Sequence, residues 1–305
     1  MLFQYVAFLA VCAASASPNP CLHKGCPLKG GLNLRDVKRM TSSRPNILNN
    51  SNNLNILQWN ILYDKVKNTS DSWLFRKDFV CDYINAVNPD IMGLQEVMES
   101  QLVELQQCLP HYHIFGEQRD SVPNALYNPI LVKRSPKMRV TRTGTFWLSL
   151  IPDIKGSKAP TSKEPRICTW VEIDNGSTKP FIVATTHLAW RSQKTAANQI
   201  SILIQHLQSN ILQDAKQPLV VTGDFNWESN STVYATMKEA GFSNTMLDSQ
   251  FVFPALTALP PYPGLIDYVW QQGFNSLFSA TLMDNRPDNG RYLSDHRPVL
   301  AILRV

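Results

Sequence analysis

Polar side chains recur in this chain at the points where apolar runs end. In the stretch VVTGDFN an apolar run stops at Gly223, Asp224 follows, and Asn226 comes two residues later. Because alternate residues of an extended chain share a face, Asp224 and Asn226 are expected to point the same way. Other apolar runs carry further polar residues of this kind, namely Asn60, Glu96, His187, Asp267, Asp295 and His296.

These residue types suit the hydrolysis of phosphate esters. Carboxylate and amide oxygens are hard donors that favour Mg²⁺ or Mn²⁺ over Zn²⁺. His296 is a candidate general base because imidazole titrates near neutral pH, and Asp267 could orient its ring. His187 offers a hydrogen-bond donor to a phosphoryl oxygen. Oxygen ligands and two histidines together indicate metal-assisted displacement at phosphorus.

Each of these residues also has an ordinary structural explanation. A single aspartate or asparagine at a strand end commonly forms a turn or caps a helix. A single histidine is commonly a structural residue with satisfied hydrogen bonds. Only the complete set, in its order along the chain, favours an active site.

The segments that would hold these residues alternate between strand and helix patterns. Strand–helix–strand units near residues 54–96 and 181–226 predict mixed sheets covered by helices, an α/β sandwich. A polar, proline-bearing stretch at 151–165 is expected to be a surface loop. Helices are predicted at 71–87, 100–109, 192–212 and 231–241, and strands at 54–62, 89–97, 128–135, 144–150, 166–173, 179–190, 217–226, 264–270, 276–283 and 297–305.

Composition is that of a globular protein that prefers anionic partners. The chain has 305 residues, of which 44% are apolar, enough for a sizeable core. Its net charge of +5 favours anions, although no long basic run marks a nucleic-acid site. Residues 17–52 are polar and rich in Pro, Asn and Ser, so we expect a flexible segment there. No linker pattern follows residue 54, which favours one domain over 53–305.

The first residues have the pattern of a signal peptide. An apolar stretch from Leu2 to Val11 precedes Ala14-Ser15-Ala16, which fits a signal-peptidase site. A signal peptide over 1–16 predicts a secreted, soluble protein without a stable membrane anchor; the alternative is a buried N-terminal helix. Four N-x-[ST] sequons fit secretion, at Asn49, Asn68, Asn175 and Asn230.

The cysteines do not have the spacing of a zinc site. Cys21 and Cys26 flank a short loop and could pair in an oxidising compartment. Cys81, Cys108 and Cys168 lie in apolar patterns, which favours buried thiols, although the sequence leaves the disulfide pairing open.

Six short motifs occur in an order that resembles the endonuclease/exonuclease/phosphatase superfamily, which has the fold of deoxyribonuclease I. The resemblance covers roughly residues 54–305 and implies a four-layered α/β sandwich, in which two mixed β-sheets are flanked by helices. The motifs are QWN (58–60), LQEV (94–97), THL (186–188), GDFN (223–226), IDYVW (266–270) and SDHRPV (294–299).

Within that superfamily the chain resembles the small, often secreted, magnesium-dependent branch and the eukaryotic deadenylase catalytic domains. Phosphoinositide 5-phosphatases are less similar, because they carry a basic residue shortly after GD-x-N and Trp227-Glu228-Ser229 has none. Neutral sphingomyelinases share the fold and remain an alternative.

The resemblance implies roles for individual residues. Glu96 would be the principal metal ligand, with Asn60 and Asp295 assisting. Asp224 and Asn226 would position the attacking water and the phosphate. The resemblance also makes His296 the base, Asp267 its orienting partner and His187 the second histidine of the site, with Asn128 and Arg166 as candidate phosphate contacts.

We therefore expect a secreted, magnesium-dependent or manganese-dependent phosphodiesterase that acts as a nuclease and is monomeric. A first alternative is a phospholipid or sugar-phosphate phosphoesterase, for which the apolar segment 251–256 could protrude into a membrane, although a buried loop is the favoured interpretation. A second alternative is a binding module without catalysis, which the intact residue set disfavours. No protein partner can be inferred.

Overall fold

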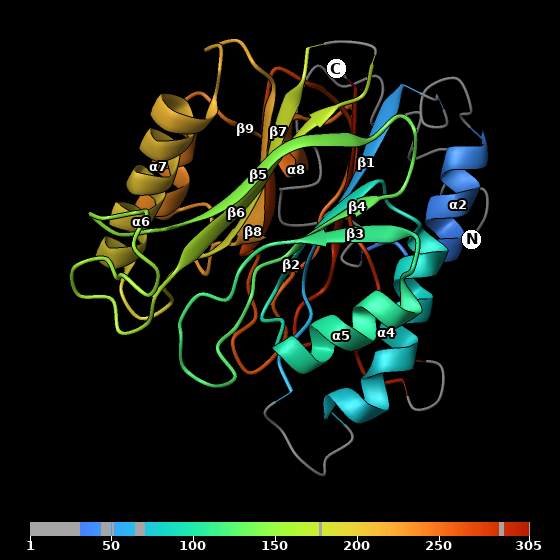
Figure 1. The fold of residues 1–305 in the computed structure, drawn as a ribbon. Coiled ribbons are helices and arrows are strands. Elements are labelled where there is room, and N and C mark those ends of the chain that lie inside the picture. The colour runs from blue at the N-terminus through green and yellow to red at the C-terminus, as the bar shows by residue number, and fades with distance from the viewer. Residues whose placement is uncertain are drawn as a thin grey trace.

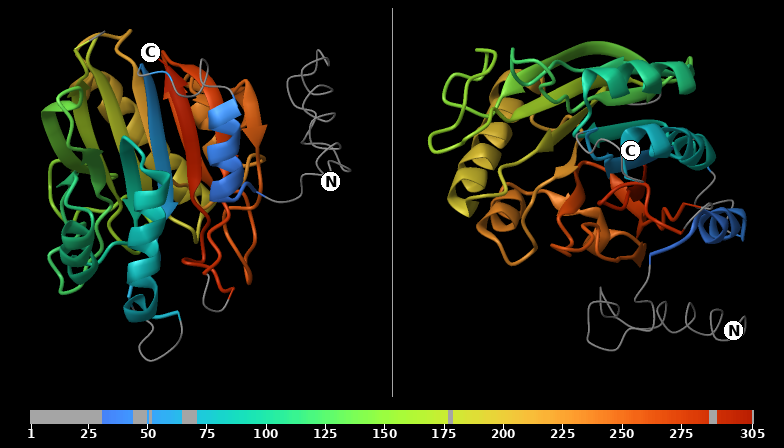
Figure 2. Two further views of the ribbon diagram at one scale, coloured as in Figure 1. Left: turned by 90° about the vertical axis from the view of Figure 1, so that its right-hand side faces the viewer. Right: turned by 90° about the horizontal axis from the view of Figure 1, so that it is seen from below.

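Two β-sheets lie face to face, with helices on both outer faces (Figures 1 and 2). The computed structural model describes residues 31–43, 50, 52–64, 71–176, 179–286 and 290–304. This arrangement confirms the predicted four-layered α/β sandwich with two mixed sheets. No helix within those ranges is both long and apolar enough to cross a membrane.

The seven-stranded sheet has the order β10-β12-β13-β1-β2-β4-β3. Near its centre, β1 (Asn53–Asn60) runs parallel to β2 (Ile91–Gln95) and antiparallel to β13 (Val299–Arg304). The other strands are β3 (Tyr112–Phe115), β4 (Ile130–Lys133), β10 (Phe251–Phe253) and β12 (Asn275–Thr281).

The six-stranded sheet has the order β5-β6-β7-β8-β11-β9. Its strand β8 (Leu219–Asp224) runs parallel to β7 (Phe181–His187) and antiparallel to β11 (Asp267–Gln272). The other strands are β5 (Arg139–Trp147), β6 (Ile167–Asp174) and β9 (Ser243–Asn244).

The helices bury their apolar sides against the outer faces of the sheets. The seven-stranded sheet is covered by α4 (Trp73–Val87), α5 (Glu99–Cys108) and α2 (Leu34–Ser43). The six-stranded sheet is covered by α6 (Gln193–His206), its π-helical continuation Leu207–Ile211, and α7 (Thr232–Glu239). A short helix, α8 (Thr245–Asp248), contacts both β11 and β12.

Alternation along the strands explains why the site lies between the sheets. On β1, Leu57 and Trp59 pack in the outer apolar cluster, whereas Ile56 packs in the core between the sheets. The next residues on that inner face are Gln58 and Asn60, so the inner face changes from apolar to polar toward the end of the strand. The same face of neighbouring strands carries Gln95, Thr185, His187, Thr222, Asp224 and Asp267, all buried.

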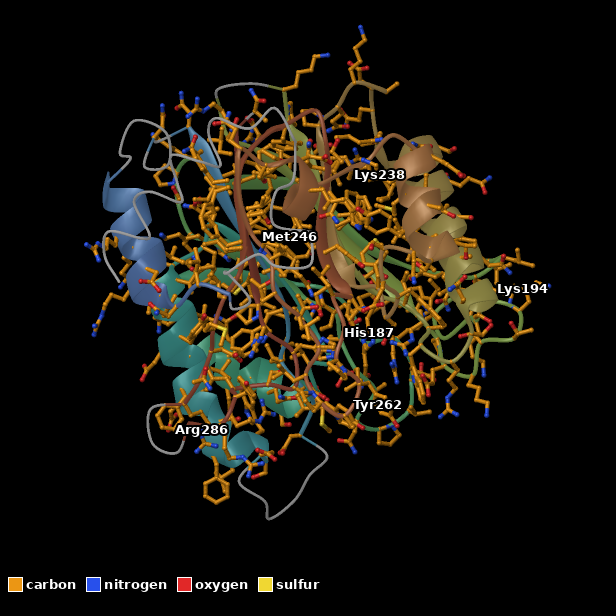
Figure 3. The ribbon with its side chains drawn as sticks, turned by 180° about the vertical axis from the view of Figure 1, so that it is seen from behind. His187, Lys194, Lys238, Met246, Tyr262 and Arg286 are labelled. Carbon is orange, nitrogen blue, oxygen red and sulfur yellow. A yellow bond between two sulfur atoms is a disulfide. The ribbon has the colours of Figure 1, made fainter. Side chains whose placement is uncertain are left out.

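One end of the inter-sheet layer is therefore polar, and it lies where β1, β2, β7 and β8 end and β11 begins. Loops extend beyond these strand ends. Figure 3 shows His187 toward this end, with Tyr262 farther out along it. We call this end of the sandwich the site end.

The predicted helices and strands are confirmed in type, with bounds that differ by a few residues. Residues 151–165 form the expected loop, most of it exposed or partly exposed. The structure adds α2, β3, β9, β10 and α8, which are short or lie in polar sequence. Residues 34–43, which lie within the segment 17–52 expected to be flexible, form α2.

Several N-terminal predictions lie outside the described residues. They are the signal peptide at 1–16, the pairing of Cys21 with Cys26, and the sequons at Asn49 and Asn68. The domain start at residue 53 also stays a prediction. Of the other sequon asparagines, Asn230 is exposed and Asn175 is partly exposed.

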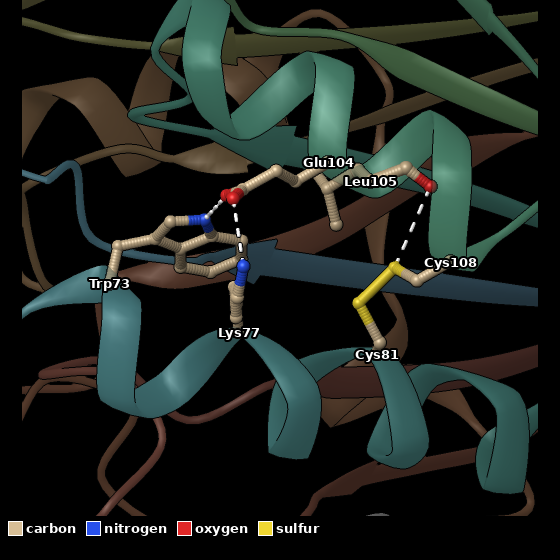
Figure 4. The surroundings of a disulfide bond; sticks show 6 residues. All are labelled: Trp73, Lys77, Cys81, Glu104, Leu105 and Cys108. Atoms are coloured by element: carbon tan, nitrogen blue, oxygen red, sulfur yellow. Dashed lines mark hydrogen bonds and ion pairs between the residues drawn. A yellow bond between two sulfur atoms is a disulfide. The ribbon is translucent and has the colours of Figure 1, made fainter.

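Cys81 and Cys108 form a disulfide, although their apolar patterns favoured buried thiols (Figure 4). The sequence could not show that α4 and α5 lie side by side, with an ion pair between Lys77 and Glu104 at 2.9 Å. Cys168 is a buried free thiol, as predicted, and burial raises its pKa.

Removing this disulfide is expected to destabilise the protein. The bond links residues 27 positions apart, and closing such a loop contributes about 2–4 kcal/mol. The double variant Cys81→Ala/Cys108→Ala should therefore melt roughly 5–10 °C below the wild type in a thermal scan. A reductant should lower the melting temperature of the wild type but not of this variant. No effect of the reductant on the wild type would contradict the pairing.

Asp284 carries a buried carboxyl whose oxygens have no hydrogen-bond partner among the described residues. Burial raises its pKa from 3.8 to about 7, although Arg297 opposes the shift. As the pH rises from about 4 to 7, the unfolded chain ionises first, so this carboxyl increasingly destabilises the fold. Asp284→Asn should therefore raise the melting temperature by a few degrees at pH 8 and change it little at pH 4. An equal change at both pH values would exclude this explanation.

Candidate active site

The carboxylate of Asp224, at the end of β8, lies at the centre of the polar residues. Its Oδ2 accepts a hydrogen bond from Asn60 Nδ2 at 3.1 Å. The same oxygen lies 3.5 Å from His187 Nε2 and 3.7 Å from His296 Nε2. Asn60 belongs to the seven-stranded sheet and His187 to the other, so residues of both sheets converge on one carboxylate.

His296 and Asp267 form a hydrogen-bonded pair. His296 Nδ1 lies 2.9 Å from Asp267 Oδ2. The backbone near the ring is also held, because His296 O accepts a hydrogen bond from Trp59 Nε1 at 2.8 Å. With Nδ1 bound to Asp267, the ring directs Nε2 toward Asp224. The predicted orienting role of Asp267 therefore has the geometry it requires.

The carboxylates around His296 favour its protonated form. Burial alone would lower its pKa, but the charges of Asp267 and Asp224 outweigh burial and raise the pKa well above 6.5. Burial raises the pKa of Asp224, and the imidazole of His296 acts against that shift. In this protonated form both ring nitrogens carry a hydrogen, so the ring has to release the proton on Nε2 before it can accept one from water.

His187 is held in its neutral form. Burial, followed by the positive charges of Arg166, Arg119 and His296, lowers its pKa well below 6.5. A neutral imidazole keeps one N–H that can donate to an oxygen atom. This state suits the predicted role of His187 as a donor to a phosphoryl oxygen.

Glu96 and Asp295 form the acidic part of the site. Glu96 directly follows β2 and has a φ of +60°, a left-handed conformation that glutamate seldom adopts. Burial and then the charge of Asp295 raise the pKa of Glu96, while His296, Asn60 and Arg166 act to lower it. Asp295 is exposed at the edge of the site, and its Oδ1 accepts from Ser294 Oγ at 3.3 Å.

Two groups of residues have donors that a metal could use. Asp224, Asp267 and His296 present ligand atoms within 4.8 Å of one another. In that group, however, His296 Nδ1 and Asp267 Oδ2 are separated by a hydrogen-bond distance, which engages both atoms with each other. The second group is Glu96 and Asp295, where the charge of Asp295 raises the pKa of Glu96 and both carboxylates are donors of the kind that Mg²⁺ prefers. The residues present therefore fit a hard divalent cation.

Arg166, which precedes β6, supplies a buried positive charge next to the site. Its guanidinium donates to His187 O at 3.3 Å and pairs with Glu164 Oε2 at 3.3 Å. Its Nε is buried and has no partner among the described residues. Burial lowers its pKa to about 10, so it stays charged at neutral pH. A buried cation with an unused donor can bind an anion such as phosphate.

The side-chain amides of Asn128 and Asn226 both donate to backbone carbonyls near the site. Asn128 is buried, and its side-chain amide donates to Ile167 O at 3.4 Å. Ile167 is the residue after Arg166 in the chain. Asn226 has a φ of +61° and its N–H donates to Asp224 Oδ1 at 2.9 Å. Its side-chain amide donates to Leu188 O at 3.0 Å.

Sequence reasoning missed the residues beneath the site. Gln58 and Gln95 are fully buried, and their amides connect to Asp267 and Thr185. The available signal was their position along the chain, since Gln58 lies two residues before Asn60 and Gln95 lies directly before Glu96. Two glutamines in apolar strands have to find hydrogen-bond partners inside the fold.

The arrangement brings together a proton acceptor, a neutral donor, a buried cation and a set of oxygen ligands. The elements needed to hydrolyse a phosphate ester are a base that can activate water, charge stabilisation at phosphoryl oxygens and ligands for a divalent cation. All three are available at the site end.

Comparisons with known proteins agree with this geometry. The sequence model of the Endonuclease/Exonuclease/phosphatase family matches residues 57–296, which contain every candidate site residue. A solved structure from Bacteroides vulgatus, described as an endonuclease/exonuclease/phosphatase, superimposes with a TM-score of 0.73 at 26% identity. It covers 83% of this chain and 99% of that one.

Two curated relatives are similar in sequence. Human nocturnin is 26% identical over 296 residues, which cover 80% of this chain and 63% of nocturnin. The chain thus spans somewhat less than two thirds of that relative. The 3'-5'-exoribonuclease subunit Ccr4 of the CCR4-Not complex of Saccharomyces cerevisiae is 27% identical over 161 residues, 38% of this chain and 19% of the subunit.

Proposed function

This chain belongs to the endonuclease/exonuclease/phosphatase family, and we propose that it is a divalent-metal-dependent phosphodiesterase that acts as a nuclease. The observation that carries the proposal is the convergence of Asn60, His187 and His296 on the carboxylate of Asp224. The name of the yeast relative, an exoribonuclease subunit, supports a nucleic-acid substrate. The net charge of +5 suits a polyanion as well.

In the proposed mechanism His296, in its neutral form, accepts a proton from the water that attacks phosphorus. The P–O bond to the leaving alcohol breaks, and a proton from solvent completes that alcohol. Asp267 holds the ring in place and stabilises the imidazolium that forms. Asp224 and Asn226 position the water, and the neutral ring of His187 donates to a phosphoryl oxygen. Arg166 adds a positive charge from the adjacent strand.

We assign the metal to Glu96, Asn60 and Asp295. Mg²⁺, or Mn²⁺ in its place, would act there as a Lewis acid on the phosphoryl oxygens. A cation held by these residues would offset the charge of Asp295 on Glu96, which His296, Asn60 and Arg166 already oppose.

The proposed location is extracellular. The signal-peptide pattern at 1–16 supports it, and the disulfide between Cys81 and Cys108 is of a kind that persists in oxidising compartments. Mass spectrometry of the protein recovered from culture medium should find an N-terminus at Ser17. An intracellular protein that begins at Met1 would refute this location.

A phospholipid phosphoesterase is the second candidate, and exposed apolar side chains favour it. Leu150, Ile151 and Ile154 are 75%, 57% and 56% exposed on the loop after β5. That loop is tied to the site, because Leu148 N donates to Arg166 O at 2.8 Å. Exposed apolar clusters mark contact surfaces, and a lipid surface is one of them. The sequence suggested segment 251–256 as the part that enters a membrane. Residues 251–253 of it form the strand β10, and Phe253 is buried.

Cleavage assays on single-stranded RNA and plasmid DNA test the proposed function. The wild type should cleave at least one of them, and Asp224→Ala should abolish the cleavage. Asp214→Ala is the matched control, because Asp214 is exposed and pairs with Lys179 at the opposite end of the sheets. If neither nucleic acid is cleaved and phospholipid vesicles are hydrolysed, the lipid candidate replaces the nuclease.

A further inference from the structure

We infer that Gln58 and Gln95 are positioning residues for the reaction, because their paired amides set the orientation of Asp267 and, through it, of His296. The inference rests on the proposed function, in which His296 accepts the proton of the attacking water and Asp267 orients its ring. Neither glutamine contacts the substrate side of the site directly, so both would act through Asp267.

The four side chains involved form a continuous buried network. Gln58 Nε2 donates to Asp267 Oδ1 at 2.9 Å and to Gln95 Oε1 at 2.8 Å. Gln95 Nε2 donates in turn to Gln58 Oε1 at 2.8 Å and to Thr185 Oγ1 at 2.9 Å. All four residues are completely buried, so water does not compete for these hydrogen bonds.

The carboxylate of Asp267 determines which end of each glutamine amide donates a hydrogen bond and which end accepts one. An ionised carboxylate only accepts hydrogen bonds, so the NH₂ group of Gln58 has to face it. The other end of the Gln58 amide, Oε1, then faces Gln95. This oxygen accepts a hydrogen bond, which the NH₂ group of Gln95 donates. With Oδ1 of Asp267 held by Gln58, Oδ2 is left for His296 Nδ1. The amide pair thus fixes the orientation of the carboxylate, with one oxygen bound to Gln58 and the other at hydrogen-bond distance from His296.

The network also joins the two sheets directly beneath the site. Gln58 and Gln95 lie on β1 and β2, whereas Thr185 and Asp267 lie on β7 and β11. The sheets come close at Gly93 on β2, where a Cβ atom would be 2.2 Å from Thr222 Oγ1 and 2.5 Å from Thr185 Oγ1. This close approach leaves Gln95 little room to move. The network can therefore hold the proposed ligands Asn60 and Glu96 against Asp267 of the other sheet.

A role confined to stability would have different consequences. Two glutamines can satisfy each other without Asp267, and removing one would then lower stability without a specific effect on turnover. A positioning role instead predicts a loss of kcat that depends on Asp267. The two cases can be separated with kinetics and with a direct probe of the histidine.

The kinetic test compares Gln58→Met with Gln271→Met. Methionine keeps the length of the side chain but removes the amide. Gln271 is a matched control, because it is buried on β11 with Asp267 but at the far end, where its Oε1 accepts from Phe274 N. Gln58→Met should lower kcat by about 10–100-fold with KM within about twofold, and Gln271→Met should leave both unchanged.

A double-mutant cycle shows whether Gln58 acts through Asp267. In an Asp267→Ala background, Gln58→Met should cause no further loss of kcat. An equal loss in that background would assign Gln58 a merely structural role, and wild-type kcat in Gln58→Met would refute the inference outright.

A measurement without substrate keeps the inference testable if the proposed function fails. In ¹⁵N-histidine-labelled protein, the Nδ1–H resonance of His296 can be identified by its absence from His296→Gln. Gln58→Met should shift or remove this resonance, while Gln271→Met should leave it in place. An unchanged resonance in Gln58→Met would overturn the inference, whereas a wild type without turnover on any phosphoester would overturn only the proposed function.

Discussion

A His296→Gln variant is expected to lose about three orders of magnitude in kcat while KM changes little. Glutamine fills much of the same space but cannot accept and release a proton near neutral pH. The loss should be large because the ring is the proton acceptor that faces Asp224, with Asp267 bound to its other nitrogen. Steady-state kinetics on whichever phosphodiester the wild type cleaves measures the effect.

The matched control for this variant is His113→Gln. His113 is exposed on β3, far from the site end, so its replacement should leave kcat at the wild-type value. A His296→Gln variant with more than about a tenth of wild-type kcat would remove His296 from the proton transfer. Thermal scans of both variants separate such a result from loss of folded protein.

A Glu96→Gln variant is expected to require much more metal for activity. Glutamine keeps one oxygen but loses the charge, and Glu96 is the proposed principal ligand. The Mg²⁺ concentration for half-maximal activity should rise by about 10–100-fold, with kcat reduced even at saturating metal. Titration of apo-enzyme with Mg²⁺, followed by calorimetry and by activity, measures both effects.

Glu239→Gln provides the control for the loss of one negative charge. Glu239 is exposed on α7 and should have no effect on the metal titration. EDTA should abolish the activity of the wild type, and Mg²⁺ or Mn²⁺ should restore it. An unchanged metal requirement in Glu96→Gln would place the cation elsewhere, with Asp224, Asp267 and His296 as the next group to test.

Much of the fold was predictable because its strands are long and regularly patterned. The apolar runs that end in Asn60, His187 and Asp224 all became strands that carry these residues to the site end. Strands β9 and β10 were missed because two or three residues are too few to show a period. The helix α2 was missed because its polar sequence resembles a flexible segment.

The sequence placed the candidate residues at the ends of strands, but the contacts among them could be predicted only in part. The pairing of His296 with Asp267 follows the expectation drawn from the family. The turn at Asn226 does not, because its positive φ directs its amide to Leu188 O.

Contacts between distant parts of the chain could not be predicted from the sequence. Gln58 and Asp267 are 209 positions apart, and only the packing of two sheets brings them together. The disulfide between Cys81 and Cys108 depends in the same way on how α4 lies against α5.

The most direct test of the central claim is the metal dependence of phosphodiester hydrolysis by the purified protein. The substrates would be plasmid DNA, single-stranded RNA, sphingomyelin and a soluble phosphoinositide head group, each assayed with Mg²⁺ and with EDTA. We predict hydrolysis of a nucleic acid that EDTA abolishes. Hydrolysis that persists fully in EDTA, or no hydrolysis of any of the four, would contradict the claim of a metal-dependent phosphodiesterase.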